Sequence, residues 1–354
     1  MIIDCMIIGQ GICGTFLAYE LEKAGLSFMV IDDPGSSGAS RLAAGVINPI
    51  TGRRLVRTWM IDELFPFALN AYKEIGTALG IECLSKIRLI DFFPSAQMRL
   101  AFLDRYNESA PELTLPDDEN HWRAYFNYEF GFGQISPCAL ANLNLLLPAF
   151  RNKLDEAGLL FEDKMSIDSL SLETNYVQYK DIKAKKVIFC DGMASFSNPY
   201  FSKLPFAPNK GEALIIAIDG LRETNIFKKG MSLVPWNKNL FWLGSSYEWQ
   251  FNDPNPSYAF RERAEILLRQ WLKLPFEILD HFSAIRPATL ERRPFVGFHP
   301  EFPQIGILNG MGTKGCSLAP YFASQLRGNM TKGLPVHDEV NISRFTRILG
   351  KSTH

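Results

Sequence analysis

A glycine-rich turn between an apolar strand and a helix is the feature that most restricts the fold of this chain of 354 residues. Residues 2–8 (IIDCMII) are short, apolar and rich in β-branched side chains, as buried parallel strands are. The turn GQGICG at 9–14 follows, and residues 15–24 carry apolar side chains at helical spacing before Gly25. A second apolar stretch, 27–31, ends at Asp32. This order predicts a βαβ unit of the Rossmann type.

Each glycine of the turn has a physical role in dinucleotide binding. Gly9 permits the tight turn after the strand, Gly11 lets a pyrophosphate approach the backbone, and Gly14 lets the helix pack close to the strand. The free N–H groups of the first helical turn, at Ile12 and Cys13, attract phosphate. We therefore expect these five residues to form a dinucleotide site.

An acidic residue follows the second strand at the distance that the motif requires. Asp32 stands about 20 residues after the glycines, where its carboxylate can accept hydrogen bonds from ribose hydroxyls. Asp33 is a second candidate for the same role, although its side chain is expected to face solvent. The βαβ unit by itself does not distinguish NAD from FAD.

Composition narrows the class of protein. The chain is 47% hydrophobic and 21% charged with a net charge of −1, and it has no basic stripe of the kind that nucleic-acid binding needs. We expect no signal peptide and no membrane span, since no uncharged apolar run reaches about 18 residues. The six scattered cysteines form no CxxC pair and the histidines show no metal-binding spacing, so reduced thiols, a cytoplasmic location and no metal site are expected.

The segment after the second strand indicates which of the two dinucleotides, NAD or FAD, is bound. Residues 36–50 read SSGASRLAAGVINPI, which resembles the flavin-contacting stretch of the D-amino-acid oxidase superfamily, including glycine oxidase and sarcosine oxidase. The resemblance implies that Ser40 and Arg41 contact phosphate or ribitol. It also implies that Ala44, Gly45 and Val46 approach the isoalloxazine, where small residues allow the backbone to lie close to a flat ring.

The resemblance continues through the middle of the chain. A helix ending near Gly158 precedes residues 159–167, which resemble the family's adenine clamp, with Ile167 as the contact. The strand and turn VIFCDG at 187–192 resemble a segment near the pyrophosphate, with Cys190, Asp191 and Gly192 as contacts. Family members usually have Ala or Thr in place of Cys190 and Asp191, and an acid near a pyrophosphate is unfavourable unless it points away.

A late glycine loop supports FAD rather than NAD. Residues 286–297 resemble the family's "RP.T.D..P..G" element, and GMGTKG at 310–315 resembles a second loop and helix N-terminus facing the flavin. The implied contacts are Arg286, Gly310, Met311, Gly312, Thr313, Lys314 and Gly315. A nicotinamide dehydrogenase has no use for such a loop, so the expected cofactor is FAD.

The resulting prediction is an α/β fold with two domains. A discontinuous Rossmann-type FAD-binding domain is expected over residues 1–75, 138–204 and 282–354. A substrate domain with a mixed or antiparallel sheet is expected over 76–137 and 205–281, because strands 213–218, 231–234 and 240–244 have no helices between them. A turn at 237–239 joins the last two strands as a hairpin. The segment from Thr331 onward is expected to be a peripheral extension.

The family resemblance implies oxidation of the C–N bond of a small amine or amino acid by hydride transfer to flavin N5. Arg286 would fork onto a substrate carboxylate, the alternative being an arginine that binds backbone carbonyls. Tyr247 would fix the substrate through its hydroxyl, or lie partly buried as a core residue. Glycine oxidases carry a second arginine where Thr313 stands, so Lys314 would replace that charge or lie near N5.

The sequence is also compatible with other functions. The oxidase half of the enzyme that modifies the tRNA wobble uridine has a similar late loop, and it oxidises a secondary amine. A 2-hydroxy acid or glycerol-phosphate dehydrogenase uses the same fold. A non-catalytic flavoprotein is the alternative of another class. The electron acceptor is expected to be O2 or a carrier protein, and a homo-oligomer is also open.

Overall fold

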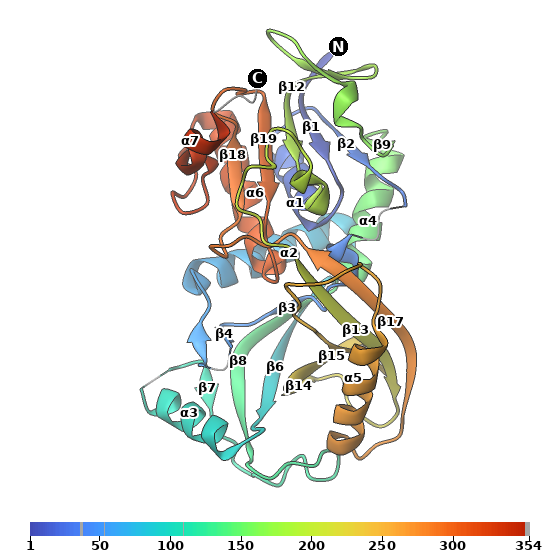
Figure 1. Ribbon diagram of the computed structural model, residues 1–354, viewed down its shortest axis with the longest axis vertical. Helices are drawn as coiled ribbons and strands as arrows, with labels where there is room; N and C mark the ends of the chain where they lie inside the picture. Colours follow the sequence, from blue (N-terminus) through green and yellow to red (C-terminus); the bar gives the residue numbers. More distant parts are fainter. Residues whose placement is uncertain (36–37, 53, 109, 351–354) are drawn as a thin grey trace.

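The computed structural model describes residues 1–35, 38–52, 54–108 and 110–350. Its strands form two large sheets, which lie one above the other in Figure 1, each with its own helices. The six cysteines are buried free thiols, as predicted. None of the helices in the described ranges combines the length and the apolar character needed to cross a bilayer.

The first sheet has the predicted βαβ unit at its centre. Strand β1 (Ile2–Ile8) pairs in parallel with β2 (Phe28–Asp32) and with β12 (Ile182–Phe189), and α1 (Ile12–Lys23) connects β1 to β2. Parallel strands β9 (Leu160–Glu162) and β19 (Ile305–Asn309) extend the sheet on either side. The predicted strands and helix are confirmed, and segments from both ends of the chain share one sheet. Antiparallel additions are β10 (Leu170–Leu172), β11 (Val177–Tyr179) and β18 (Phe295–Phe298).

Helices from distant parts of the chain cover this sheet. Helix α1 packs with α2 (Ile61–Leu79), α4 (Leu143–Glu156) and α6 (Gly315–Lys332) in one apolar cluster. Within it, the rings of Phe16 and Tyr72 meet edge to face with centroids 5.0 Å apart, a favoured aromatic geometry. Because α1 is buried between the sheet and α6, its N-terminal turn is held rigidly beside the end of β1.

The second sheet is mixed, as predicted. Its order is β17-β13-β16-β15-β14-β6-β8-β3, and the β14–β6 pair is parallel whereas the other neighbouring pairs are antiparallel. The strands are β3 (Val46–Ile47), β6 (Leu84–Phe92), β8 (Phe132–Ala141), β13 (Asn209–Ile218), β14 (Asn225–Lys229), β15 (Met231–Asn237), β16 (Leu240–Gly244) and β17 (Phe276–Arg286). The predicted hairpin joins β15 to β16, and Asn239 in its turn has a φ of +58°.

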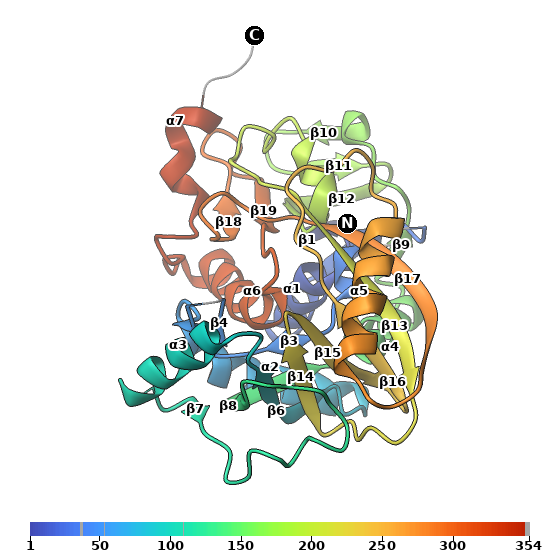
Figure 2. The same ribbon diagram turned by 60° about the horizontal axis from the view of Figure 1, so that its bottom comes forward.

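Helix α5 (Tyr258–Trp271) lies over one face of the second sheet, across β13 and β17 in Figure 2. Its buried residues Phe260, Leu268 and Trp271 pack against Leu214 and Phe241. The opposite face of this sheet is therefore the one left for a ligand. Smaller elements are η1 (Ala39–Leu42), β4 (Ile50–Thr51), β5 (Val56–Arg57), α3 (Ala96–Asn107), β7 (Leu113–Thr114), η2 (Ile167–Ser169), η3 (Gly192–Phe196), η4 (Ile342–Phe345) and α7 (Thr346–Leu349).

The sequence predicts domain boundaries and a peripheral C-terminal segment, and the structure bears on both. Strands β8 and β17 run across the predicted domain boundaries at 138 and 282, and the domain division itself stays a prediction. The expectation of a peripheral extension from Thr331 is wrong. Apolar side chains of this segment, Val336, Val340, Ile342, Phe345 and Leu349, are buried in the cores around the first sheet, so it is part of the fold up to the end of the described residues at 350.

Candidate active site

A cavity of about 560 Å³ lies where the two sheets meet. Its walls on one side are the loop after β1, the segment 39–52, the end of β12 and the loop that leads into α6. On the other side they are strands β6 and β13 to β17 of the second sheet. A cavity between the two halves of a chain, at the carboxyl ends of parallel strands, is where ligands of open α/β sheets bind.

The glycines of the first loop act mainly through packing. A Cβ on Gly14 would lie 1.8 Å from the carbonyl oxygen of Gly9, and a Cβ on Gly9, whose φ is +98°, would lie 2.7 Å from that of Cys190. Neither residue lines the cavity, whereas Gly11, Ile12 and Cys13 do. The two packing glycines therefore let α1 start close to β1, and the N-terminus of that helix faces the cavity.

Asp32 is held by three donors behind this loop. Its carboxylate is 7% exposed, accepts the backbone N–H of Gln10 at 2.8 Å, and pairs with Arg151 at 2.6 Å and Arg41 at 3.3 Å. Arg41 thus contacts Asp32 and does not line the cavity. Arg151 on α4 has no signal in the sequence, because 119 residues separate it from Asp32.

Asp33 has a different role from Asp32. Its Oδ1 accepts the N–H of Gly35 at 2.8 Å, which is a local turn contact, and it does not line the cavity. Ile167 is also distant from the lining, since it packs with the core on the far side of the first sheet. Contacts of either residue with a cofactor stay predictions.

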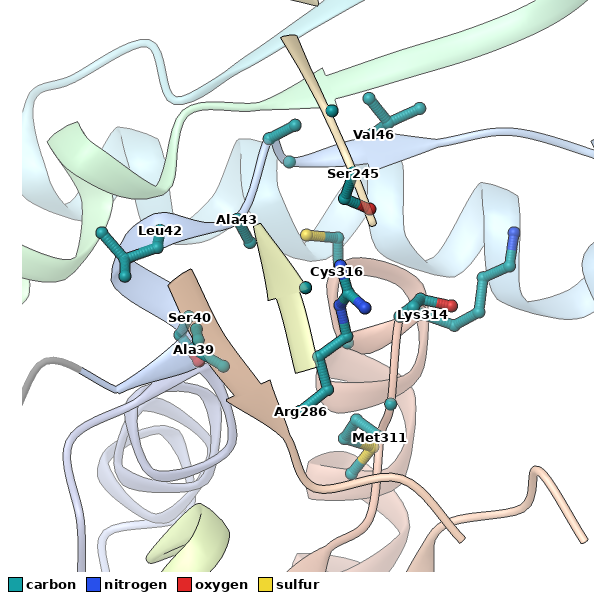
Figure 3. Close-up of a pocket in the computed structure, with 18 of the residues that line it drawn as sticks. Ala39, Ser40, Leu42, Ala43, Val46, Ser245, Arg286, Met311, Lys314 and Cys316 are labelled. Atoms are coloured by element: carbon teal, nitrogen blue, oxygen red, sulfur yellow. The ribbon is translucent and has the colours of Figure 1, made fainter. Parts of the chain in front are cut away.

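The segment carrying the ASRLAAG sequence runs along the cavity. Ser40, Ala44, Gly45 and Val46 line it, and Figure 3 labels Ser40 and Val46 of these. Ser40 Oγ accepts the N–H of Ile12 at 3.1 Å. A Cβ on Gly45 would lie 1.9 Å from the carbonyl oxygen of Ala141, so only glycine allows this approach to β8. Residues 36 and 37 of the resembling stretch lie outside the described residues.

The turn after β12 brings two of its three predicted contacts to the cavity. Cys190 and Gly192 line it. Asp191 does not: its Oδ1 accepts hydrogen bonds from Ser195 Oγ and, at 3.3 Å, from Asn309 Nδ2. Burial raises the pKa of Asp191 to about 7. The acid thus points away from the site, as an acid near a pyrophosphate must.

The late glycine loop forms the wall opposite the ASRLAAG segment. Met311, Gly312, Thr313, Lys314 and Gly315 line the cavity at the start of α6. Gly310 lies beneath them, and a Cβ on it would meet Thr289 Cγ2 at 2.7 Å.

Lys314 is a partly buried cation with a neutral partner. Its Nζ donates to Asn48 Oδ1 at 3.1 Å, and burial lowers the pKa of Lys314 to about 8. Its side chain is directed away from Arg286 (Figure 3). It therefore supplies positive charge at a place in the cavity different from that of Arg286.

Arg286 at the end of β17 is the second cation of the cavity wall, and it is partly buried. Its Nη1 donates to Asn209 Oδ1 at 2.6 Å, and Nη1 and Nη2 each lie 3.3 Å from the carbonyl oxygen of Ser246. The guanidinium lies 5.7 Å from the ring centre of Tyr247, which lines the cavity and is half-exposed. It also lies directly over Gly211, where a Cβ would meet Nη2 at 1.8 Å. These partners are all neutral, and no carboxylate of the described residues forms an ion pair with Arg286, so its charge is uncompensated within this part of the chain.

A third cation, Lys228 on β14, also lines the cavity and pairs with Asp91 at 2.8 Å. Among the described residues that line the cavity there are thus three cations, Lys228, Arg286 and Lys314, and no Asp, Glu or His. Such a lining favours anionic ligands and offers no carboxylate or imidazole as a general base. Across the described ranges, no group of three His, Cys, Asp or Glu residues is placed to hold a metal ion.

Several lining or supporting residues have no recognisable signal in the sequence. These are Asn48, Asn209, Lys228, Ser245 and Trp242, whose Nε1 donates to the carbonyl oxygen of Leu42 at 3.1 Å. All except Asn48 belong to strands of the second sheet or to the loop after β16, and they reach the cavity through strand pairing between segments far apart in the sequence.

The cavity fits FAD. Because Gly9 and Gly14 let α1 start close to β1, its N-terminus faces the cavity and can hold a pyrophosphate. Asp32 lies behind this loop, and its contact with ribose stays a prediction. The small residues Ala44 and Gly45 leave room for a flat ring, and the N-terminus of α6 stands across from them.

The fold and this cavity define a dinucleotide-binding oxidoreductase whose active centre lies between a Rossmann-type sheet and a mixed sheet. The family model described as DAO, FAD dependent oxidoreductase, matches residues 4–327. The chain belongs to this family of FAD-dependent oxidoreductases, and its cofactor is FAD.

Known relatives agree with this assignment. A glycine oxidase of Pseudomonas aeruginosa is 24% identical over 360 residues, covering 94% of this chain and 96% of the relative. The crystal structure of glycine oxidase from Geobacillus kaustophilus superposes with a TM-score of 0.78 at 18% identity, covering 99% of both chains. Iminodiacetate oxidase from Chelativorans sp. BNC1 gives a TM-score of 0.74 at 19% identity, with 97% of this chain and 98% of that chain covered. The structural matches show the shared fold.

Proposed function

We propose that this protein oxidises the C–N bond of an amino acid, a small amine that carries a carboxylate. The observation that carries the proposal is Arg286: a partly buried guanidinium in the cavity wall whose described partners are Asn209, Ser246 and Tyr247, all neutral. A charge that is partly withdrawn from water is costly unless it is paired, so an anionic group of the substrate is the expected partner. The planar fork of a guanidinium matches a carboxylate with two parallel hydrogen bonds.

The residues around Arg286 orient the substrate. Asn209 and the Ser246 carbonyl fix the plane of the guanidinium, and Tyr247 borders the same space with its ring and hydroxyl. Because the described lining offers no Asp, Glu or His, the amine must enter in its neutral form for its Cα–H to be transferred. When bound, FAD supplies the acceptor for that hydride at its N5 atom.

Lys314 provides a second positive charge at the start of α6. Below a pH of about 8 the ammonium is charged, and together with the N-terminus of α6 it favours negative charge on a neighbouring group. In this proposal Lys314 and Thr313 lie toward the cofactor, whereas Arg286 holds the substrate. The final electron acceptor is O2 or a carrier.

The test is anaerobic reduction of the bound flavin, which is monitored as a loss of the flavin's visible absorbance. A panel of glycine, N-methylglycine, other N-alkyl amino acids, D-amino acids and L-amino acids is expected to include donors that bleach the flavin. Oxygen consumption with the same donors then distinguishes an oxidase from a dehydrogenase. Reduction only by 2-hydroxy acids, by glycerol phosphate or by a secondary amine on a uridine would contradict the proposed substrate class, and no reduction by any donor would favour a non-catalytic flavoprotein.

A further inference from the structure

The floor of the cavity is a row of residues that face one another across six strands. Directly paired residues of neighbouring strands share one face of a sheet. The row is Phe282, Ala213, Gly244, Ser232, Lys228 and Asp91, from β17, β13, β16, β15, β14 and β6 in turn. The first five line the cavity, so Lys228 faces the same space as the floor beneath the substrate.

Small side chains keep the path along this floor open. Between the guanidinium of Arg286, which lies over Gly211 on β13, and Lys228 on β14 stand Gly244 and Ser232. Three strand spacings separate β13 from β14, which is about 14 Å at the usual distance between strands. An amino acid the size of glycine bound at Arg286 therefore does not reach Lys228, but an elongated one does.

Lys228 is built to hold a ligand at this far end. Its Nζ lies 2.8 Å from Asp91 Oδ2, and the Asp91 side chain is 8% exposed whereas that of Lys228 is 28% exposed. An ammonium has three N–H donors, and Asp91 is the one hydrogen-bond partner of Lys228 Nζ among the described residues. The buried carboxylate orients the ammonium and compensates its charge, and the remaining N–H donors are available to a ligand in the cavity that Lys228 lines.

We infer that Lys228 recognises a second anionic group, remote from the one held by Arg286. The substrate class is then an elongated amino acid with an acidic group at its distal end. This inference rests on the proposed function, because it assumes that Arg286 holds the first carboxylate. Lys228 acts here as a specificity-determining residue and takes no part in the transfer itself.

The experiment measures ligand affinity on the FAD-loaded protein, through the change in flavin absorbance on binding. The probes are straight-chain α,ω-dicarboxylates from succinate to sebacate, each compared with its own monoamide, which has the same length and one charge less. We expect the short pairs to bind equally. The longer dicarboxylates are expected to bind about tenfold more tightly than their monoamides, because only they place a charge at Lys228.

Two substitutions are expected to shift this preference in opposite directions. Lys228→Met removes the donor, so the preference for long dicarboxylates over their monoamides falls to about one. Asp91→Asn removes the competing carboxylate and keeps the shape, so the preference rises. The matched control is Lys229→Met, because Lys229 is the next residue on β14, contacts the carbonyl oxygen of Asn127 and does not line the cavity.

If the ion pair between Lys228 on β14 and Asp91 on β6 only stabilises the sheet, the two substitutions are expected to have a different effect. Both variants would then weaken every ligand alike, or lower only the melting temperature, and either result would overturn the inference. If Asp91→Asn does not fold, Lys228→Met alone decides between the two outcomes. Binding of monoamides with no preference for long dicarboxylates overturns the role of Lys228 and leaves the proposed function in place. No binding of any carboxylate overturns both.

Discussion

Arg286 and Asn209 face each other on the paired strands β17 and β13, and Arg286 Nη1 donates to Asn209 Oδ1 over 2.6 Å. Asn209 is fully buried, and its Nδ2 has no hydrogen-bond partner within the described part of the chain. A neutral amide at this position fixes the guanidinium without cancelling its charge. No carboxylate of the described residues cancels that charge, which distinguishes this arrangement from a structural salt bridge.

Substituting Asn209 by Asp tests that relationship. The new carboxylate would pair with Arg286, so we expect the affinity for carboxylate ligands to fall by about 10- to 100-fold, while FAD binding is unchanged. Asn209→Ala is the control, because it removes the hydrogen bond and leaves the positive charge. Titration of a monocarboxylate into the flavin-loaded variants measures the effect, and equal losses in both variants would show that the charge is not what matters.

Asp32 is expected to support both FAD binding and folding. Asp32→Ala removes the predicted acceptor for ribose and leaves Arg151 and Arg41 without their shared partner, although Arg151 keeps Glu162. We expect weaker FAD binding and a loss of about 2–4 kcal/mol in the free energy of unfolding, since removing one partner of a buried ion pair leaves a charge uncompensated. Fluorescence titration with FAD and urea unfolding of the apoprotein separate these effects. An unchanged FAD affinity would contradict the role of Asp32 at the ribose.

The packing of α1 against β1 makes Gly14 irreplaceable. In Gly14→Ala the new methyl group would lie 1.8 Å from the carbonyl oxygen of Gly9, so α1 must move away from the loop. We expect a large drop in melting temperature and loss of FAD uptake. Gly25→Ala is the matched control at the other end of α1: it has open space and a φ of +68°, and it should cost only about 1 kcal/mol and leave FAD binding intact.

The βαβ unit was predictable from the sequence because its signals are local. Strand, glycine turn, helix and Asp32 follow one another within the first 32 residues, so the apolar pattern and the spacing of the glycines are enough to predict the unit. The family resemblance then indicated the late loop at 310–315, five residues of which line the cavity.

The cavity floor was not predictable in this way. Lys228 and Asp91 are 137 residues apart, and strand pairing alone places them side by side. Asn209 meets Arg286 for the same reason. No periodicity in the sequence encodes which residues of different strands face each other. The burial of the C-terminal segment was missed because its apolar residues are widely spaced between polar ones.

Asp191 predicts a distinctive dependence of stability on pH. Burial raises its pKa from 3.8 to about 7, so the folded protein holds this proton more tightly than the unfolded chain does. The stabilisation from this group is complete below a pH of about 4 and is lost as the pH rises through about 7. Asp191→Asn is therefore expected to be more stable than the parent by a few kcal/mol at pH 8, and about equally stable near pH 4.

Melting temperatures measured across this pH range check the expectation for Asp191. The exposed Asp117→Asn serves as the control, for which no such divergence is expected. A constant difference between Asp191→Asn and the parent from pH 4 to pH 8 would show that Asp191 is already ionised in the folded protein.

The central claim is that Arg286 holds the carboxylate of the donor while its amine is oxidised. The most direct measurement compares anaerobic flavin reduction by an amino acid and by the corresponding amine that lacks the carboxylate, in the parent and in Arg286→Met. The parent should prefer the amino acid by about 100-fold or more in the rate at low donor concentration, since a charged bidentate contact contributes about 3 kcal/mol or more. Arg286→Met should bind FAD normally and lose that preference. Equal preference in both proteins would contradict the account.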